Sequence, residues 1–257
     1  DGRFANNGWL QELPRPIHKL TWDNAALMSP ATAQRFGITT PGLSAGPQER
    51  PSEALTSGQT TTQMVMLTYK GNQVTAPVMI VPGHADNAVT VNLGYGRTQA
   101  GNVGNNVGFS AYALRTSDAP WFGGGLEVAL IPGSSYPLAM TQVSYALIGR
   151  DDIVRSATLE EYLKHPEFAR TEHAAPAVPA DVGKDLKEGS RSMYPPFLYD
   201  GYKWGMVIDM SVCIGCNICS LACQAENNIP VVGKTEVHRG RVMHWLLIDQ
   251  YYQGEAA

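Results

Sequence analysis

The sequence predicts an α+β chain that is mainly β and begins with a compact barrel of short strands. Residues 1–150 contain many short apolar runs separated by glycine-rich turns, a pattern typical of small barrels. Residues 151–195 open with a helix-like run and continue as an extended linker rich in proline, alanine and charge. Residues 196–257 contain all four cysteines of the chain. We therefore expect three parts with these boundaries.

The composition is that of a globular protein and argues against several classes. The 257 residues are 44% hydrophobic and 16% charged, with a formal net charge of −4. This mild acidity gives no general attraction for nucleic acid. No apolar run approaches the roughly 18 residues of a membrane-spanning helix. The first residues, DGRFANNGWL, show no signal-peptide pattern and do not resemble a natural start, so we expect a piece of a longer polypeptide.

The strands of the first part are expected at three places. Residues 62–83 predict two strands joined by a hairpin turn at 70–72, where Gly and Asn tolerate positive φ. Residues 87–96 alternate apolar and polar side chains, as a half-buried strand does. Residues 123–133 form a further apolar run bounded by glycines.

Two helices are expected before the cysteines. In the first, Ser29 is a suitable N-cap, a proline follows at the first helical position, and Gly37 can end the helix. In the second, Ser156 or Thr158 can serve as the cap and Pro166 stops the helix. The third part should consist of a strand over 204–210, the cysteines, a helix over 220–228 and a strand over 243–252.

The cysteines Cys213, Cys216, Cys219 and Cys223 have the spacing C-x2-C-x2-C-x3-C. Steps of three residues bring the first three thiols around a tight loop, and the fourth follows as the chain enters a helix. This spacing matches the bacterial ferredoxin run, and thiolates are the soft donors that iron–sulfur clusters require. Gly215 permits the tight loop and leaves backbone N–H groups available to cluster sulfurs. All four cysteines are therefore predicted cluster ligands.

Other functions of four cysteines fit this spacing less well. A structural zinc site usually places a longer loop between two cysteine pairs. Attached haem needs C-x-x-C-H, but Asn217 and Ser220 stand where the histidine would be. A redox dithiol needs two cysteines, and disulfides between such close neighbours would be strained.

The ligand count leaves two interpretations of the cluster open. In two-cluster ferredoxins the fourth cysteine of the run serves the other cluster. Either Cys223 completes a single cluster with Cys213, Cys216 and Cys219, or it belongs to a second cluster and further ligands lie beyond Ala257. We favour the second interpretation. Gln224 replaces the proline that usually follows the run, which affects the turn and not the ligands.

Both ends of the chain resemble parts of the molybdopterin oxidoreductase family. The run WGMVIDMSVCIGCNICSLACQAENNIPVVGK, followed by GRVMHWLLIDQYY, resembles the start of its four-cluster ferredoxin subunits. Upstream, LTWDNAALMSPATAQRFGI and APVMIVPGHADNAVTVNLGYGRTQAGNVGNNVGFSAYALR resemble the C-terminal barrel domain that helps to hold the molybdopterin dinucleotide.

This order of domains, with RDDIVRSATLEEY between them, is similar to the iron–sulfur subunit of bacterial alternative complex III. The resemblance implies an electron-transfer subunit that relays electrons from quinol toward a cytochrome c or copper protein. It implies [4Fe–4S] clusters, with [3Fe–4S] as an alternative in the same subunit, and a barrel without molybdopterin. The implied partners are a multihaem cytochrome c subunit and a quinol-binding membrane subunit, on the periplasmic side of the inner membrane. The alternative is a true molybdopterin-dependent reductase of the polysulfide or DMSO reductase type.

Several other residues have a functional and a structural interpretation. The loop GYGRTQAGNVGNNVG could hold nucleotide phosphates, with His84 and Arg97 as candidates, or simply form turns. His238 and His244 follow the cysteines and could relay protons, but a structural role is the simpler expectation. The aromatic residues around the cysteines are expected to shield a cluster from water; they are Tyr202, Trp204 and Trp245.

Overall fold

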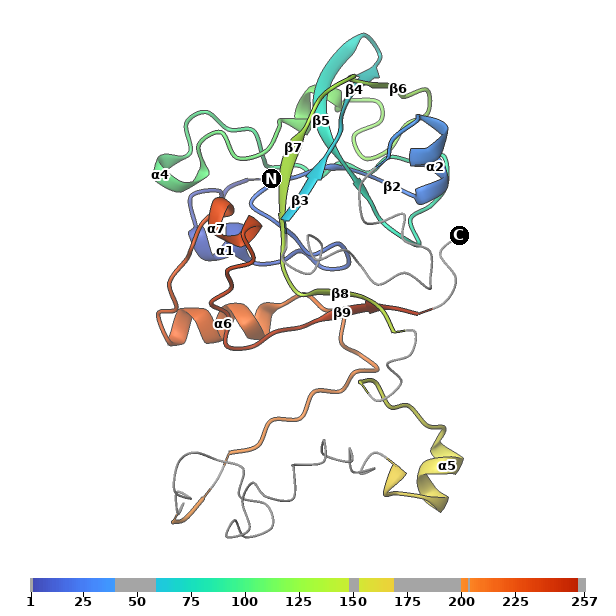
Figure 1. The fold of residues 1–257 in the computed structure, drawn as a ribbon. Coiled ribbons are helices and arrows are strands. Elements are labelled where there is room, and N and C mark those ends of the chain that lie inside the picture. Colours follow the sequence, from blue (N-terminus) through green and yellow to red (C-terminus); the bar gives the residue numbers. More distant parts are fainter. Residues whose placement is uncertain (1, 40–58, 148–152, 169–199, 203, 254–257) are drawn as a thin grey trace, which may run out of the picture. The chain divides into compact units, whose positions relative to one another are not determined.

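The structure is a computed structural model and divides into two compact units. The first unit comprises Asp1–Ile148 and Ile214–Ala257, and the second comprises Gly149–Cys213. The residues described are 2–39, 59–147, 153–168, 200–202 and 204–253. All the sheets found in them belong to the first unit (Figure 1).

The larger sheet of the first unit has four strands in the order β2-β5-β4-β6. Their bounds are β2 Ala26–Met28, β4 Met64–Tyr69, β5 Asn72–Ile80 and β6 Glu127–Leu130. β2 runs parallel to β5, whereas β4 pairs antiparallel with both of its neighbours. The β4–β5 hairpin turns at Lys70 and Gly71, both with positive φ, which confirms the predicted turn. β6 confirms the strand predicted within 123–133.

Two smaller sheets complete the first unit. The three-stranded sheet has the order β1-β7-β3, and the two-stranded sheet pairs β8 with β9 in parallel. The bounds are β1 Leu20–Thr21, β3 Gln59–Thr62, β7 Tyr136–Met140, β8 Val143–Ala146 and β9 Gln250–Tyr252. In the described part of the chain these sheets are separate and do not close into a barrel, so the barrel remains a prediction.

One expected strand is absent, so that prediction is wrong, and another is much shorter than predicted. Within 87–96 only Thr90 pairs, in an isolated bridge to Leu27, because the chain turns away through Gly94 and Gly96, both at positive φ. The strand expected over 243–252 is confined to β9, and the residues before it are irregular.

The core of the first unit follows the alternation of its central strands. In β4 the side chains of Val65, Leu67 and Tyr69 are buried, while the intervening ones are only partly covered. Met28 of β2 and Val78 of β5 join Val65 and Leu67 in one fully buried cluster. A second cluster, around Leu20 and Leu138, joins the two larger sheets. Burying such side chains stabilises the fold by roughly 1.5–3 kcal/mol each.

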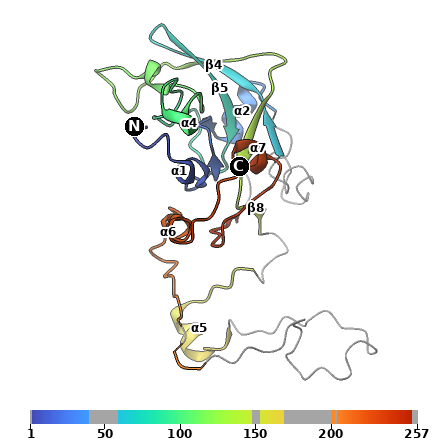
Figure 2. The ribbon, with the colours of Figure 1, turned by 90° about the vertical axis from the view of Figure 1, so that its left-hand side faces the viewer.

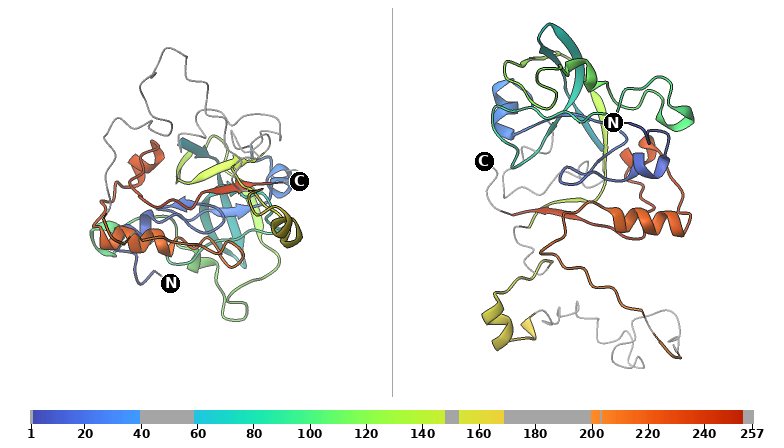
Figure 3. Two further views of the ribbon diagram at one scale, coloured as in Figure 1. Left: turned by 90° about the horizontal axis from the view of Figure 1, so that it is seen from below. Right: turned by 180° about the vertical axis from the view of Figure 1, so that it is seen from behind.

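Short helices flank these sheets. They are α1 Gly8–Glu12, α2 Pro30–Arg35, α4 Gly101–Gly104, the 3₁₀ turn η1 Ala111–Leu114, α6 Ile218–Glu226 and α7 Lys234–His238. The Ser29 hydroxyl accepts a hydrogen bond from Thr32 N, as expected for the N-cap of α2. Helix α1 lies beside α6 (Figures 2 and 3), and α7 contacts β7. No helix in the described ranges is long and apolar enough to cross a membrane.

The second unit contains α5, Leu159–Lys164. Thr158 caps it, and Glu161 completes a capping box by accepting from Thr158 N at 2.8 Å. The predicted helix is therefore confirmed, with Thr158 and not Ser156 as its cap. The strand expected over 204–210 is wrong, because no described strand pairs with this segment. Most of the expected linker, residues 169–195, lies outside the described residues.

A buried ion pair connects α7 to the strands of the first unit. Lys234 Nζ lies 2.6 Å from Asp23 Oδ2, and the Asp23 side chain is only 2% exposed. The Tyr136 hydroxyl donates to Asp23 Oδ1 at 3.0 Å and accepts from Lys234 Nζ at 3.0 Å. Burial raises the pKa of Asp23. Its contacts with Lys234 and Tyr136 lower this pKa, but they offset only part of the effect of burial.

We expect Lys234→Met to lower the free energy of unfolding by about 3 kcal/mol at neutral pH, because Asp23 would stay buried without its partner. Since the pKa of Asp23 is raised in the folded protein, folding favours its protonated form, and the deficit should shrink as the pH falls toward about 4. Urea denaturation between neutral pH and about pH 4 measures both the loss of stability and its dependence on pH.

The matched control is Lys164→Met, which removes an exposed ion pair with Glu160 on α5. It should cost less than about 0.5 kcal/mol at any pH. Equal losses in the two variants, or a Lys234→Met deficit that does not change with pH, would contradict a buried pair.

Candidate functional site

The cysteine loop turns through two residues with left-handed backbone conformations. Gly215 has φ 65° and Asn217 has φ 62°, so they lie on either side of Cys216 in this conformation. Glycine adopts it without strain, and asparagine tolerates it better than most residues do. The turn directs the chain into α6, which begins at Ile218, two residues before the expected start.

Helix α6 has a polar buried side. Asn217, Ser220 and Gln224 are each 1% exposed, and their spacing of three and four residues places them on one face. Cys219 and Cys223 lie four residues apart within α6 and so share a neighbouring face, whereas Cys216 precedes the helix. Cys216 is exposed, and Cys219 and Cys223 are partly exposed. The helix therefore buries amide and hydroxyl groups and leaves its thiols accessible.

Three long-range hydrogen bonds hold the cysteine segment against the rest of the first unit. Asn217 Nδ2 donates to Pro14 O at 2.7 Å, and Ser220 Oγ donates to Leu246 O at 2.7 Å. Trp9 Nε1 donates to Ile229 O at 2.8 Å. Asn217 thus anchors the loop between two thiols, a role that the cysteine spacing alone did not indicate.

Glu12 is the centre of a second set of contacts. Its carboxylate is 1% exposed and accepts hydrogen bonds from Val232 N, Gly233 N and Trp22 Nε1 at 2.8–3.1 Å. A buried carboxylate is costly unless such donors satisfy it. The C-terminal end of α1 therefore fixes the turn that leads into α7.

Other polar groups near α6 are buried without hydrogen-bond partners among the described residues. They include both amide atoms of Gln224, both ring nitrogens of His244 and Nε2 of His238. Burial lowers the pKa of His244, and the Glu12 charge opposes this only in part. Burial therefore favours the neutral ring of His244, and the structural role expected for this residue stays a prediction.

The donor chemistry of the four cysteines fits an iron–sulfur cluster. All four are free thiols, and thiolate sulfur is the usual ligand of such clusters. Cys216, Cys219 and Cys223 belong to the first unit, while Cys213 is the exposed last residue of the second. Within the described ranges no three His, Cys, Asp or Glu side chains come together as a metal-binding group. The four side chains are thus of the right chemical type to bind an iron–sulfur cluster. Their convergence around a cluster remains a prediction.

The side chains expected to shield a cluster are exposed. Trp245 is 67% exposed in the first unit, and Tyr202 and Trp204 are fully exposed in the second. Ile214 and Ile218, which flank Cys216, are 79% and 62% exposed. Cys216 therefore lies between two isoleucines that the described part of the chain leaves uncovered.

The structure gives His84 an ordinary role in its loop. His84 Nε2 and Thr90 Oγ1 are 2.9 Å apart, and His84 is half-buried. Arg97 O accepts from Asn106 N at 2.7 Å, which closes the glycine- and asparagine-rich loop. These contacts support the interpretation of this region as a set of turns.

Comparisons with known proteins give partial similarity. No protein-family model matches the chain. The chain is 42% identical over 53 residues to the menaquinone reductase iron–sulfur cluster-binding subunit of Nitratidesulfovibrio vulgaris strain Hildenborough, covering 21% of the chain and 20% of that protein. It is 30% identical over 73 residues to a selenate reductase subunit of Mesobacillus selenatarsenatis, covering 28% of the chain and 22% of that protein.

The matched parts span about a fifth of the length of these curated relatives. One relative is named as an iron–sulfur cluster-binding subunit, and both are named as subunits of reductases. The similarity therefore supports an iron–sulfur subunit of an oxidoreductase, and it does not single out alternative complex III.

The anchor at Asn217 can be tested by two substitutions. Asn217→Gly keeps the left-handed turn but loses the hydrogen bond to Pro14 O, and we expect it to lower the free energy of unfolding by about 1–3 kcal/mol. Asn217→Ala should cost about 1 kcal/mol more, because alanine is strained at this φ. Chemical denaturation measures both; equal stability of the two variants would show that the backbone conformation contributes nothing.

Proposed function

We propose that this chain is part of an electron-transfer subunit in which Cys213, Cys216, Cys219 and Cys223 are ligands of iron–sulfur clusters. The observation that carries the proposal is the ferredoxin spacing of four free thiols, two of which, Cys219 and Cys223, lie partly exposed on α6. The partial similarity to an iron–sulfur cluster-binding subunit supports it independently. The proposed assignment places the first three cysteines at one cluster and Cys223 at a second.

A bound cluster would supply one-electron transfer, without making or breaking bonds in a substrate. The chain's own residues would hold it in place. Gly215 and Asn217 shape the loop around Cys216, and the buried polar side of α6 fixes the orientation of Cys219 and Cys223. A rigid support limits rearrangement of the ligands when the charge of the cluster changes.

More specifically, we propose a subunit of the alternative complex III type. Such a subunit passes electrons from quinol toward a periplasmic cytochrome c or copper protein. The order of the two resemblances supports it, since the stretch that resembles a molybdopterin-type barrel precedes the cysteine run. In this proposal the partners are a multihaem cytochrome c subunit and a quinol-binding membrane subunit. The subunit would be peripheral, on the periplasmic side of the bacterial inner membrane.

A second candidate is an electron-transfer role in a molybdopterin-dependent reductase. The names of the two similar proteins favour it, because both belong to reductases. Molybdenum and tungsten analysis of the purified complex separates the candidates. Either metal in stoichiometric amount supports the reductase, and the absence of both supports the alternative complex III type.

The cluster assignment predicts that protein purified without oxygen contains iron and acid-labile sulfide and gives a low-temperature EPR signal on reduction or oxidation. Cys219→Ser should lose iron, sulfide and signal from one cluster, since serine is a harder and weaker ligand. Ala222→Ser is the matched control, because it adds a hydroxyl to the exposed part of the same helix and keeps every thiol. Zinc in place of iron, or full cluster content in Cys219→Ser, would contradict the assignment.

A further inference from the structure

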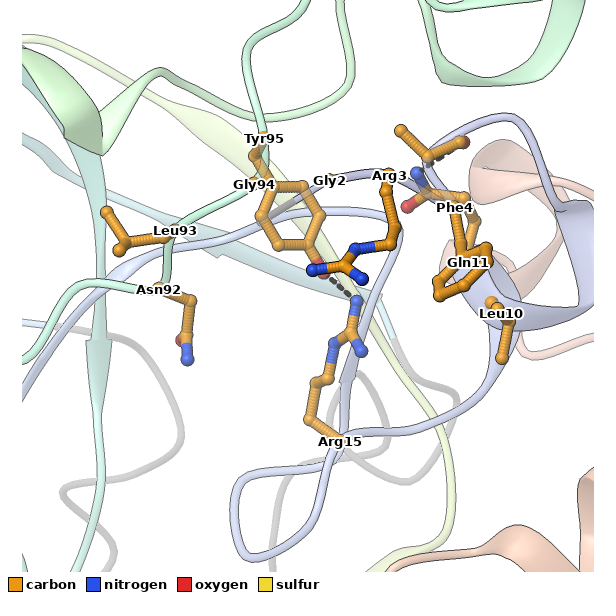
Figure 4. Close-up of a pocket in the computed structure, with 11 residues that line it drawn as sticks. Gly2, Arg3, Phe4, Leu10, Gln11, Arg15, Asn92, Leu93, Gly94 and Tyr95 are labelled. Atoms are coloured by element: carbon orange, nitrogen blue, oxygen red, sulfur yellow. Dashed lines mark hydrogen bonds between the residues drawn. The ribbon is translucent and has the colours of Figure 1, made fainter.

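Two features of the first unit have no part in the proposed electron transfer. One is a cavity of about 280 Å³, in which the Arg15 guanidinium donates to the Tyr95 hydroxyl (Figure 4). The other is the loop of residues 115–126, between η1 and β6, where two large apolar side chains face solvent. Trp121 is 75% exposed and its neighbour Phe122 is 88% exposed. Exposed apolar surface of this kind marks a contact site for a protein or a membrane.

Contacts with the β4–β5 hairpin hold this loop in a defined shape. Lys70 Nζ, at the turn of the hairpin, lies 2.5 Å from Asp118 Oδ2 (Figure 2). Gly123 lies against the last residue of β4, since a Cβ at this position would be 2.2 Å from the Tyr69 hydroxyl oxygen. The loop is thus fixed on both sides of its aromatic pair. The exposure of the two rings therefore belongs to the folded structure and does not result from a loose loop.

Arg115 adds a positive charge beside the aromatic pair. Its Nε donates to Pro120 O at 2.9 Å, and its guanidinium carbon lies 4.3 Å from the centre of the Trp121 ring. A guanidinium that stacks on a ring can still donate at its edge to an oxyanion such as a phosphate. The end of the loop therefore combines apolar rings with a cation, as protein surfaces do where they contact the headgroup region of a bilayer.

The aromatic pair is too small to form a specific protein interface by itself. Two aromatic side chains offer at most about 500 Å² of surface. A specific interface buries about 800 Å² on each partner. The residues that follow the pair add little, because Gly124 and Gly125 have no side chain, and a Cβ at either position would meet no described atom within 4 Å. A bilayer requires no matching surface, so it suits this small exposed pair better than a second protein does.

The charges favour a neutral lipid surface over an anionic one. The chain has a formal net charge of −4, which gives no general attraction for anionic lipid. Near the aromatic pair the charges of Lys70 and Asp118 offset each other, and Glu127 at the start of β6 balances Arg115. Zwitterionic phospholipids have no net charge and still present a phosphate to Arg115.

We propose that Trp121 and Phe122 insert into the headgroup boundary of a zwitterionic phospholipid bilayer, with Arg115 contacting a lipid phosphate. Tryptophan suits this depth because its ring is apolar and its N–H can donate to the headgroups. This chain itself then contacts lipid, independently of its cysteines and of any membrane subunit.

Flotation of the chain with phosphatidylcholine vesicles tests the proposal. We expect binding that persists at high salt, because salt does not screen the insertion of apolar side chains, and that does not strengthen when phosphatidylglycerol is added. The absence of binding, or binding that requires phosphatidylglycerol and is lost at high salt, would overturn the proposal.

Tryptophan fluorescence identifies the part of the chain that enters the bilayer. Vesicles of brominated phosphatidylcholine should quench part of the fluorescence of the bound protein. Trp121→Phe keeps an aromatic ring and should still bind, but it should lose most of this quenching. If the quenching is unchanged in Trp121→Phe, another surface enters the bilayer and the assignment to this loop is wrong.

A matched pair of variants measures the contribution of the loop. Phe122→Ser should weaken binding about tenfold or more, the effect of withdrawing one large apolar side chain from apolar surroundings. Phe4→Ser makes the same change at another exposed position of the first unit and should leave binding unchanged. Iron content should be equal in both variants, so this test does not depend on the cluster assignment. Equal binding by the two variants would overturn the role of the loop.

Discussion

The buried carboxylate of Glu12 is the constraint on which the arrangement of the first unit depends. It lies at the end of α1 and satisfies two backbone N–H groups of the segment after the cysteines, together with the Trp22 indole. The nearby ion pair of Asp23 and Lys234 connects the same segment to the strands. Because unpaired groups in such surroundings are costly, these contacts favour one position of the C-terminal segment over others.

This arrangement explains how α6 can present thiols. The helix packs its amide and hydroxyl groups inward, where Asn217 and Ser220 find backbone partners, so its cysteines lie on an accessible stripe. The exposed isoleucines beside Cys216 are the kind of surface that a cluster and its covering segment would bury. The support for the ligands is thus built mainly from residues more than 200 positions earlier in the chain, Trp9 and Pro14.

Local patterns predicted the local features well. The caps at Ser29 and Thr158 and the Lys70–Gly71 turn follow from short-range chemistry, and each was confirmed. Strands were less predictable, because a strand needs a partner. The mostly apolar run 204–210 has no described neighbour to pair with. The cysteine spacing named the candidate ligands. It could not indicate Glu12, because nothing local in the sequence connects this residue to its distant partners.

Glu12 holds the segment that follows the cysteines in place, and hydrogen exchange tests this most directly. Glu12→Gln puts an amide NH₂ among donors, so amides of α6 and α7 should exchange roughly tenfold faster, while β4 and β5 keep their protection. Glu226→Gln makes the same chemical change at an exposed position of α6 and should have little effect. If the two variants exchange alike, Glu12 does not hold the segment in place.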